Sequence, residues 1–160
     1  AKPLGFKLFI TDDREEFVDP ERFPEADILM PLKPEEALME LPINTNSFIV
    51  IATRGHRYDN TALLAAANTS AGYVGLLGSK RKTILIYEDL IDSGLDMERV
   101  RSIRAPIGLD ITARTPEEIA ISIMAEILMF RLGGSGLPMK LEDFHIDRIS
   151  KKIEERKILT

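Results

Sequence analysis

The sequence predicts an α/β fold in which helices cover both faces of a mostly parallel, doubly wound sheet. Two observations carry this prediction. Short apolar runs alternate along the chain with segments of helical pattern, as they do in strand–helix–strand units. The run 47–53 (SFIVIAT) is apolar and contains β-branched residues, which is typical of a strand buried on both faces of a sheet.

The predicted strands follow one another at short intervals. The first is 5–11, a short apolar run with one lysine that ends at the acidic stretch DDREE, and the second is 26–30, a weaker candidate. Buried strands follow at 47–53 and at 72–78, the latter interrupted by glycine. The stretch 101–110 is predicted as a strand that runs into a loop.

Helices are predicted between these strands. The segment 33–41 opens with proline and two acidic residues, which is a signature of helix starts. The segment 59–70 has Asp59 as its candidate N-cap. The segment 80–93 follows Ser79, whose hydroxyl can cap it, and places Ile84, Tyr87 and Ile91 on one face.

The strongest helix prediction is 115–132. Thr115, Pro116 and Glu118 form a capping box there, with the hydroxyl at the N-cap, proline at N1 and the glutamate at N3. After this helix the stretch GGSGLP is typical of a flexible linker. We therefore expect one domain at 1–132, followed at 133–160 by the linker and an amphipathic tail helix.

The tail has a narrow apolar stripe among many charges. It consists of Leu141, Phe144, Ile149 and Ile153. Such a helix packs on its own domain, on a twin chain or on another protein.

The bulk composition is that of one ordinary globular domain. The 160 residues are enough for one core and too few for two. The net charge of −5 argues against a nucleic-acid surface, and the lack of cysteine excludes disulfides, thiolate metal sites and cysteine nucleophiles. No apolar run approaches the ~20 residues of a membrane span and no signal peptide is visible, so we expect a cytoplasmic protein without membrane contact.

The acidic pair after the first predicted strand suggests that the sheet lacks a strand. In dinucleotide-binding folds, an acidic residue at the end of the second strand binds the ribose about 20 residues after a glycine-rich fingerprint. Only 11 residues precede Asp12. We therefore expect the first strand and the glycine-rich loop to lie before Ala1, with 1–5 as the tail of the first helix. The alternative is that Asp12 and Asp13 simply end a strand.

Polar residues gather where the predicted strands end. Right-handed crossovers place strand ends and helix starts on one edge of the sheet, and open sheets bind ligands there. Histidine side chains in general titrate near neutrality, which makes His56 a candidate, and Gly55 would let a ligand approach the backbone, although one histidine makes no metal site. The candidate ligand-binding residues at this edge are Asp12, Asp13, Arg14, Thr53, Arg54, Gly55, His56, Gly78, Ser79, Lys80, Arg81 and Asp110.

One predicted helix start carries positive charge, although the N-terminus of a helix favours negative charge. The helix after Ser79 opens with Lys80, Arg81 and Lys82, which work against the helix dipole. An anion bound there would reverse the sign, because free N–H groups and basic side chains would then converge on a phosphate or carboxylate. The alternatives are a solvated basic helix start or pairing with nearby carboxylates. Asp110 differs from the other candidates because it stands alone in an apolar loop, PIGLDIT, and would need a partner if buried.

Four motifs together resemble the Rossmann domain of the XdhC/CoxI family, the accessory proteins of xanthine dehydrogenase and carbon monoxide dehydrogenase. They are DDREEF…RFPEAD, ATRGHRYD, YVGLLGSKRK and APIGLDI…TPEEIAISIMAEI, and they occur in the family's order within residues 4–131. The resemblance implies a Rossmann-like domain that follows a smaller N-terminal domain. The chain departs from the family at Thr112 and Arg114, where we expect Gly and usually Glu or Gln.

The resemblance also implies a function. Members of the family receive the molybdenum cofactor (molybdopterin), assist its sulfuration and deliver it to the apo-hydroxylase, so we expect an insertion factor or chaperone rather than an enzyme, with no catalytic residue. The implied partners are a molybdenum hydroxylase, a cysteine desulfurase and a second copy of the chain. The phosphate of the cofactor, or the diphosphate of its nucleotide forms, would suit the cationic helix start.

Two other functions stay open. An NAD(P)-dependent oxidoreductase would use the same fold and the ribose-type aspartate, but the chain has no Tyr-x-x-x-Lys pair and offers only His56 as a proton donor. A dimerisation or docking module would instead pair the basic helix start with an acidic surface of a partner.

Overall fold

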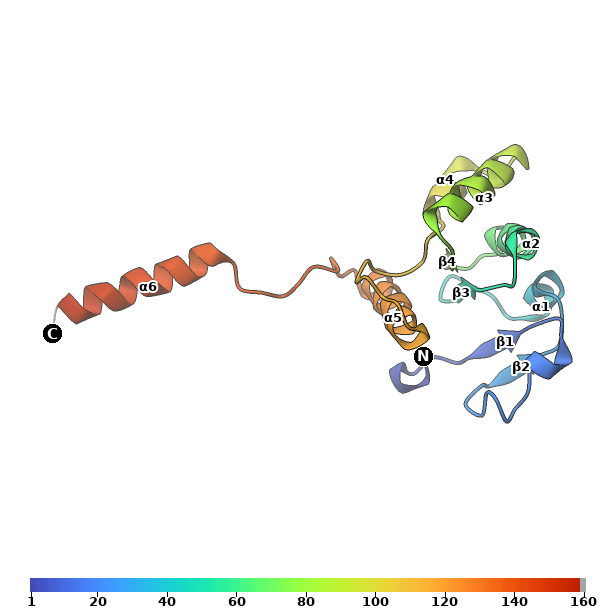
Figure 1. Cartoon of the computed structure of the whole chain (residues 1–160), viewed down its shortest axis with the longest axis horizontal. Coiled ribbons are helices and arrows are strands. Elements are labelled where there is room, and N and C mark those ends of the chain that lie inside the picture. Colours follow the sequence, from blue (N-terminus) through green and yellow to red (C-terminus); the bar gives the residue numbers. More distant parts are fainter. Residues whose placement is uncertain (159–160) are drawn as a thin grey trace.

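The computed structural model describes residues 1–158, apart from the side chains of His56 and Ile158. Strand β1 pairs in parallel with β2, and β3 pairs in parallel with β4, so the strands form two separate pieces of sheet that lie beside each other (Figure 1). Their bounds are β1 Phe9–Thr11, β2 Ile28–Met30, β3 Phe48–Ile51 and β4 Tyr73–Leu76. The predicted α/β class with parallel strands is confirmed.

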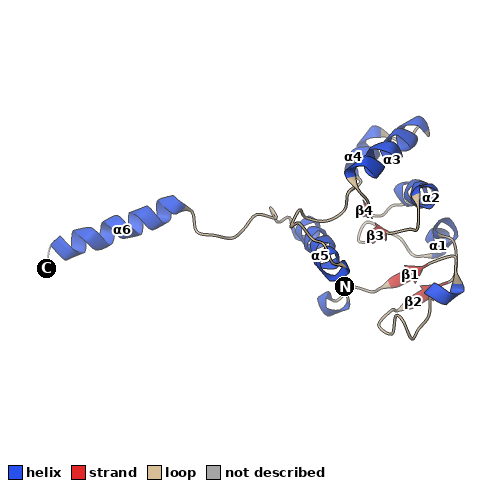
Figure 2. Cartoon of the chain, in the orientation of Figure 1, coloured by secondary structure: helices blue, strands red, loops and turns tan. Residues whose placement is uncertain are grey.

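Helices alternate with these strands and continue after them (Figure 2). They are α1 (Pro34–Glu40), α2 (His56–Ala67), α3 (Lys80–Asp92), α4 (Met97–Ser102), α5 (Pro116–Leu132) and α6 (Asp143–Ile158), with short 3₁₀ turns at Lys2–Leu4 and Glu15–Phe17. The predicted caps Ser79 of α3 and Thr115 of α5 are both confirmed by hydrogen bonds to their side chains.

The predicted strand at 101–110 is mostly wrong. Its first residues belong to α4, because the carboxylate of Asp96 accepts hydrogen bonds from two amides of the next turn and starts a helix there. Beyond α4 only Arg104 forms a strand-like bridge, to Gly75 of β4. The bridge does not extend into a longer strand, since Pro106 has no N–H to donate.

Two helix details also differ from the prediction. Helix α2 begins three residues before the expected start, and its N-cap is Gly55 instead of Asp59, which lies in the first turn and points inward. Helix α3 buries Ile86 and Leu90, whereas Ile84 of the expected face is 60% exposed. Local pattern predicted that α2 and α3 are helices, but the neighbours that decide which face is buried lie elsewhere in the chain.

The core holds helices on both faces of the β3–β4 pair. On one face, small and branched side chains of α2 pack against Val74 and Leu76 of β4 and against Leu90 of α3. On the other face, Tyr73 packs against Ile127 of α5. This arrangement is the doubly wound layering that the sequence predicts, and it leaves the carboxyl ends of the strands free for polar loops.

Helix α6 stands apart from the rest of the molecule (Figure 1). Its predicted apolar stripe is exposed, with about half of each side chain open to solvent at Leu141, Phe144, Ile149 and Ile153. The division into a domain at 1–132 and a tail at 133–160 stays a prediction.

Candidate functional site

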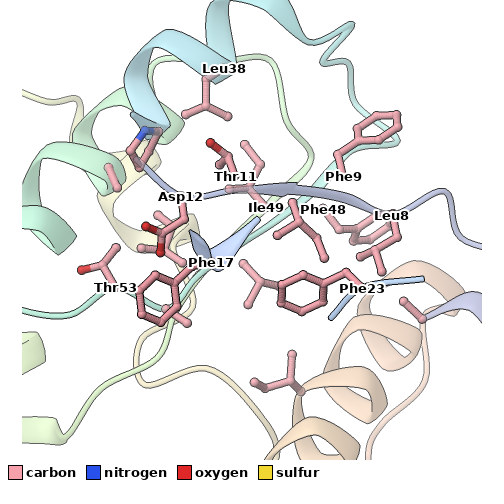
Figure 3. Close-up of a pocket in the computed structure, with 18 of the residues that line it drawn as sticks. Leu8, Phe9, Thr11, Asp12, Phe17, Phe23, Leu38, Phe48, Ile49 and Thr53 are labelled. Carbon is pink, nitrogen blue, oxygen red and sulfur yellow. The ribbon is translucent and has the colours of Figure 1, made fainter. Parts of the chain in front are cut away.

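A cavity of about 710 Å³ lies between β1 and β3 and extends to the carboxyl ends of both strands. Five predicted residues line that end of it, namely Asp12, Asp13, Arg14, Thr53 and Arg54. Figure 3 shows Asp12 and Thr53 on the same side of the cavity, although one follows β1 and the other follows β3. The parallel course of the two strands brings these polar loops together.

Asp12 is held by Arg14. Its Oδ1 accepts hydrogen bonds from the Arg14 amide at 3.0 Å and from Nε at 2.9 Å, and its Oδ2 accepts one from Nη2 at 2.9 Å. The guanidinium lowers the pKa of Asp12 below its ordinary value. Three of about four acceptor positions of the carboxylate are therefore used, so a ligand hydroxyl would have to share Asp12 with Arg14 or displace it.

Asp13 and Arg54 connect the ends of β1 and β3. Nη1 and Nη2 of Arg54 each donate to one oxygen of the Asp13 carboxylate, both at 2.9 Å. The guanidinium also lies over the ring of Tyr58, 4.1 Å from its centroid. The two carboxylates and two guanidinium groups at this rim compensate one another, so they leave no net charge there.

A second polar connection joins the end of β3 to the starts of α2 and α3. The hydroxyl of Thr53 donates to Oδ1 of Asp59 at 2.7 Å. Asp59 is completely buried, and its Oδ2 accepts no hydrogen bond but forms an ion pair with the ammonium group of Lys82. Thr53 is thus engaged in fixing the two helix starts.

The cationic triplet at the start of α3 divides into two parts. Lys82 pairs with a carboxylate, as one alternative for this triplet supposes, but the partner is the buried Asp59 and not Asp12 or Asp13, which pair with Arg14 and Arg54. Lys80 and Arg81 are exposed, and neither has an ion-pair partner within residues 1–158. Ser79 accepts a hydrogen bond from the amide of Lys82 at 3.3 Å, so the amides of Lys80 and Arg81 stay available in the first turn.

The glycines beside these helix starts differ in how much space they have. A Cβ added to Gly55 would meet no atom within 4 Å, so the backbone is open to solvent there. A Cβ on Gly78 would lie 3.3 Å from Cδ of Lys82. His56 is the first residue of α2, but its side chain lies outside the described residues.

Asp110 is exposed and does not line the cavity; its Oδ1 accepts only a long bond of 3.4 Å from the Thr112 amide. The buried carboxylate of this region is Glu126 of α5, which the sequence analysis missed. Its Oε2 accepts from the hydroxyl of Tyr73 at 2.8 Å and from the amide of Gly108 at 2.7 Å. A lone acid within the apolar run of α5 was the signal that could have revealed it.

The described residues contain neither a candidate metal site nor a candidate membrane span. Within 1–158 no group of three or more His, Cys, Asp or Glu side chains is arranged to hold a metal ion. None of the helices in the same range combines the length and the apolar character that crossing a membrane requires.

Comparison with known proteins identifies similar chains. The profile described as the XdhC Rossmann domain matches residues 1–127. The chain is 37% identical over 142 residues to a protein of Escherichia coli K12 named uncharacterized protein YqeB, with 88% of the chain and 26% of that protein covered. It is 34% identical over 131 residues to a protein of Bacillus subtilis 168 that is named as a probable xanthine dehydrogenase subunit, with 82% and 38% covered.

A third relative is the molybdenum cofactor insertion chaperone PaoD of Escherichia coli K12, which is 31% identical over 90 residues, with 56% of the chain and 28% of PaoD covered. Among solved structures, a crystal structure described as a xanthine dehydrogenase from Bacillus halodurans superposes with a TM-score of 0.71 at 30% identity. The match covers 83% of this chain and 38% of the Bacillus halodurans protein. The chain therefore spans well under half the length of each of these proteins.

Proposed function

Because the chain belongs to the family of XdhC Rossmann domains, we propose that it is an accessory domain in the maturation of a molybdenum hydroxylase. The names of two relatives support this: one is a molybdenum cofactor insertion chaperone, and the other is a probable subunit of xanthine dehydrogenase. Since the chain spans only 26–38% of the relatives' length, cofactor and partner carry over as proposals.

The observation that supports a ligand site is the start of α3. Lys80 and Arg81 lie exposed in the first turn of α3, and neither has an ion-pair partner within residues 1–158. At this end of a helix each cation is unfavourable with the helix dipole by about 0.3–1 kcal/mol. An anion would reverse this cost, since it would meet both cations and the available amides of the turn. The contacts from Thr53 through Asp59 to Lys82 keep this turn next to the end of β3.

The residues present suit the phosphate of a molybdenum cofactor or the diphosphate of its nucleotide form. Lys80 and Arg81 would bind it, and the open space beside Gly55 would admit it close to the backbone. Arg14 and Arg54 add no net charge, because Asp12 and Asp13 already neutralise them. When bound, the cofactor supplies the redox chemistry of the hydroxylase that receives it, and this chain holds the anionic group without turnover.

An NAD(P)-dependent oxidoreductase has less support. The ribose-type carboxylate, Asp12, already accepts three hydrogen bonds from Arg14. A nucleotide ribose would therefore compete with a bidentate guanidinium for the same oxygens.

We propose that α6 is the surface that contacts a partner protein. Its exposed apolar stripe stands away from the domain, which supports contact with a hydroxylase, a cysteine desulfurase involved in sulfuration, or a second copy of the chain. A role in the maturation of carbon monoxide dehydrogenase and a cytoplasmic location likewise stay predictions.

The ligand proposal can be tested by isothermal titration calorimetry with molybdopterin, AMP and NAD(P). The variant Lys80→Glu/Arg81→Glu should bind molybdopterin at least about tenfold more weakly than the wild type, a loss of about 1.4 kcal/mol. The matched control is Lys151→Glu/Lys152→Glu on α6, which changes the net charge equally and should leave the affinity unchanged. Equal affinities in both variants would contradict the proposed site, and hydride transfer from bound NAD(P)H to a carbonyl compound would favour the oxidoreductase.

A further inference from the structure

Four aromatic rings meet at the amino ends of the strands, at the edge of the sheet opposite the candidate ligand site. They are Phe6 before β1, Phe48 and Tyr73 at the starts of β3 and β4, and Phe130 in the last turn of α5. The ring centroid of Phe48 lies 5.6–6.4 Å from those of the other three. Figure 3 shows Phe48 at the other end of the cavity from Asp12 and Thr53, so these rings do not belong to the ligand edge.

An arginine lies over the ring at each end of this group. The guanidinium carbon of Arg104 is 5.8 Å from the ring centroid of Phe130, and that of Arg131 is 5.2 Å from the ring centroid of Phe6. Both arginines are exposed, and Phe130 is 40% exposed. Since Phe48 contacts both outer rings, one continuous surface results. This arginine–aromatic surface consists of Arg104, Phe130, Phe48, Phe6 and Arg131.

The positive charge of the arginine–aromatic surface is not compensated within residues 1–158. Neither guanidinium pairs with a carboxylate or donates a hydrogen bond in that range. Two carboxylates of this edge already have partners: Asp27 pairs with Lys2 at 2.8 Å, and Glu126 is buried, where it accepts bonds from a hydroxyl and an amide. The whole chain carries a charge of −5, so a local excess of positive charge is not a general property of its surface.

The opposite edge of the sheet shows how this chain completes such an arrangement. There the guanidinium of Arg14 lies 3.7 Å from the ring centroid of Phe17, and that of Arg54 lies 4.1 Å from that of Tyr58. Each of these two arginines also forms a bidentate pair with an aspartate. At the amino edge the arginines have the same kind of ring contact, but no carboxylate of residues 1–158 supplies the partner. The arginine–aromatic surface is therefore complementary to carboxylates of another molecule.

We propose that the arginine–aromatic surface docks an acidic segment of a partner protein, in which carboxylates flank an apolar or aromatic side chain. The carboxylates bind the guanidinium groups of Arg104 and Arg131, and the apolar side chain covers the rings between them. This inference goes beyond the proposed function and does not depend on it, because Lys80 and Arg81 lie at the other edge of the sheet.

The residue types suit this partner. A guanidinium group presents paired donors that match the two oxygens of a carboxylate. The ring beneath each guanidinium holds it in place, so that less side-chain freedom is lost on binding. Arginine and aromatic residues are also the types that contribute most to protein interfaces. A free phosphate would use the two guanidinium groups but not the exposed ring of Phe130.

The chain itself contains a segment of similar chemistry. The stretch 142–147 (EDFHID) places carboxylates around Phe144. Phe144 is 56% exposed in this structure, and α6 stands apart from the domain, so the segment does not occupy the surface here.

The test measures binding of a synthetic acidic peptide to the whole chain. The probe is Glu-Asp-Leu-Phe-Asp-Glu with blocked ends, and the matched control is Gln-Asn-Leu-Phe-Asn-Gln, which keeps the apolar centre and lacks the charges. In isothermal titrations the acidic peptide should bind at least about tenfold more tightly than the control. Equal affinities of the two peptides, or no binding of the acidic one, would overturn the proposal.

Substitutions locate the binding surface. Arg104→Gln/Arg131→Gln should weaken binding of the acidic peptide at least about tenfold. The matched control is Arg57→Gln/Arg114→Gln, which removes the same charge from two other exposed positions and should stay within about twofold of the wild type. All four arginines are exposed, and circular dichroism melts check that both variants fold. An equal loss in both variants would show a general attraction by charge and overturn the proposal.

Nuclear magnetic resonance separates this surface from other sites. On addition of the acidic peptide, the Nε–Hε signals of Arg104 and Arg131 should shift, whereas that of Arg81 should not. A shift of Arg81 alone would place the peptide at the start of α3 and overturn the assignment.

A shortened chain tests the internal segment. A chain that ends at Leu132 should bind the acidic peptide as tightly as the whole chain. Binding at least about fivefold tighter would identify residues 142–147, of the same chain or of a second copy, as the occupant and overturn the choice of a partner protein.

Discussion

The ammonium group of Lys82, in the first turn of α3, pairs with the completely buried carboxylate of Asp59, in the first turn of α2. The other oxygen of that carboxylate accepts a hydrogen bond from Thr53 at the end of β3. The pair therefore fixes the relative position of two helix starts and one strand end, at the edge where the candidate ligand site lies.

Replacing Lys82 should destabilise the protein because it leaves a buried carboxylate without its counter-charge. We expect Lys82→Met to lower the free energy of unfolding by about 2–4 kcal/mol in urea titrations. Lys80→Met, in the same turn but exposed, should change it by less than about 0.5 kcal/mol. Adding Asp59→Asn to Lys82→Met should restore part of the loss, and a double variant as unstable as the sum of the single ones would refute a direct interaction.

Glu126 should stabilise the loop after α4 against α5. Glu126→Ala leaves the hydroxyl of Tyr73 and the amide of Gly108 without their acceptor, so we expect a loss of about 2–4 kcal/mol in thermal or urea unfolding. Tyr73→Phe removes only one of the two bonds and should cost about 1 kcal/mol. Glu117→Ala, an exposed residue of the same helix, is the control, and the idea fails if it costs as much as Glu126→Ala.

Gly72 should not tolerate a side chain. A Cβ there would collide with the backbone carbonyl of Thr45, so Gly72→Ala must displace main chain and should cost about 1–3 kcal/mol. Gly55→Ala is the matched control, because a Cβ at Gly55 meets nothing within 4 Å, and it should stay within about 0.5 kcal/mol of the wild type. Circular dichroism melts of the two variants measure the difference. Equal melting temperatures would show that the loop at Thr45 moves to make room for the added Cβ.

Stability should fall in acid partly because of Asp12. Arg14 lowers the pKa of this carboxyl in the folded protein, so the unfolded chain binds the proton more readily. The contribution of Asp12 is therefore present above its ordinary pKa of 3.8 and is lost as the pH falls through the folded pKa. In urea titrations between pH 5 and 3, Asp12→Asn should show a smaller loss of stability than the wild type. In an Arg14→Ala background, the same substitution should have no such effect.

Helix α6 should add little to the stability of the domain, because its apolar side chains are exposed and it stands apart. A chain that ends at Leu132 should keep the free energy of unfolding of the whole chain within about 0.5 kcal/mol. A loss of more than about 1 kcal/mol would show that the tail packs on the domain in solution. Helix content lost in proportion to the deleted residues would show that α6 is helical on its own.

Much of the fold could be predicted from local sequence. The run 72–78 is apolar because β4 is buried on both faces, and Thr115 and Ser79 are caps whose bonds are local. The prediction that 47–53 is buried on both faces is wrong for Val50 of β3, which is 44% exposed. Which face of α3 is buried could not be predicted, because Ile84 and Ile86 have similar side chains and only the positions of α2 and α4 decide between them. The helix at 97–102 was missed because its last residues fall in the stretch 101–110 that was interpreted as a strand, and its cap Asp96 was not recognised.

The candidate site was predictable only as a set of strand ends. The order of the elements places Asp12, Asp13, Thr53 and Arg54 at one edge, since parallel strands end together. The pairing within the set was not predictable: Arg14 engages Asp12, Arg54 engages Asp13, and Lys82 engages a residue that was expected to cap a helix. These choices depend on side-chain reach and burial in three dimensions, which spacing along the chain does not determine.

The seam between β1 and β3 limits how cooperatively the molecule can unfold. Each half of the sheet is assembled from its own continuous stretch of chain, and the halves meet through the Phe6 and Phe48 rings, the Asp13–Arg54 pair and the packing of α1 on α2. Because no ladder of backbone hydrogen bonds crosses the seam within residues 1–158, melting of the β1–β2 half should not force the β3–β4 half to melt with it. We therefore expect the two halves of the sheet to behave as separate unfolding units.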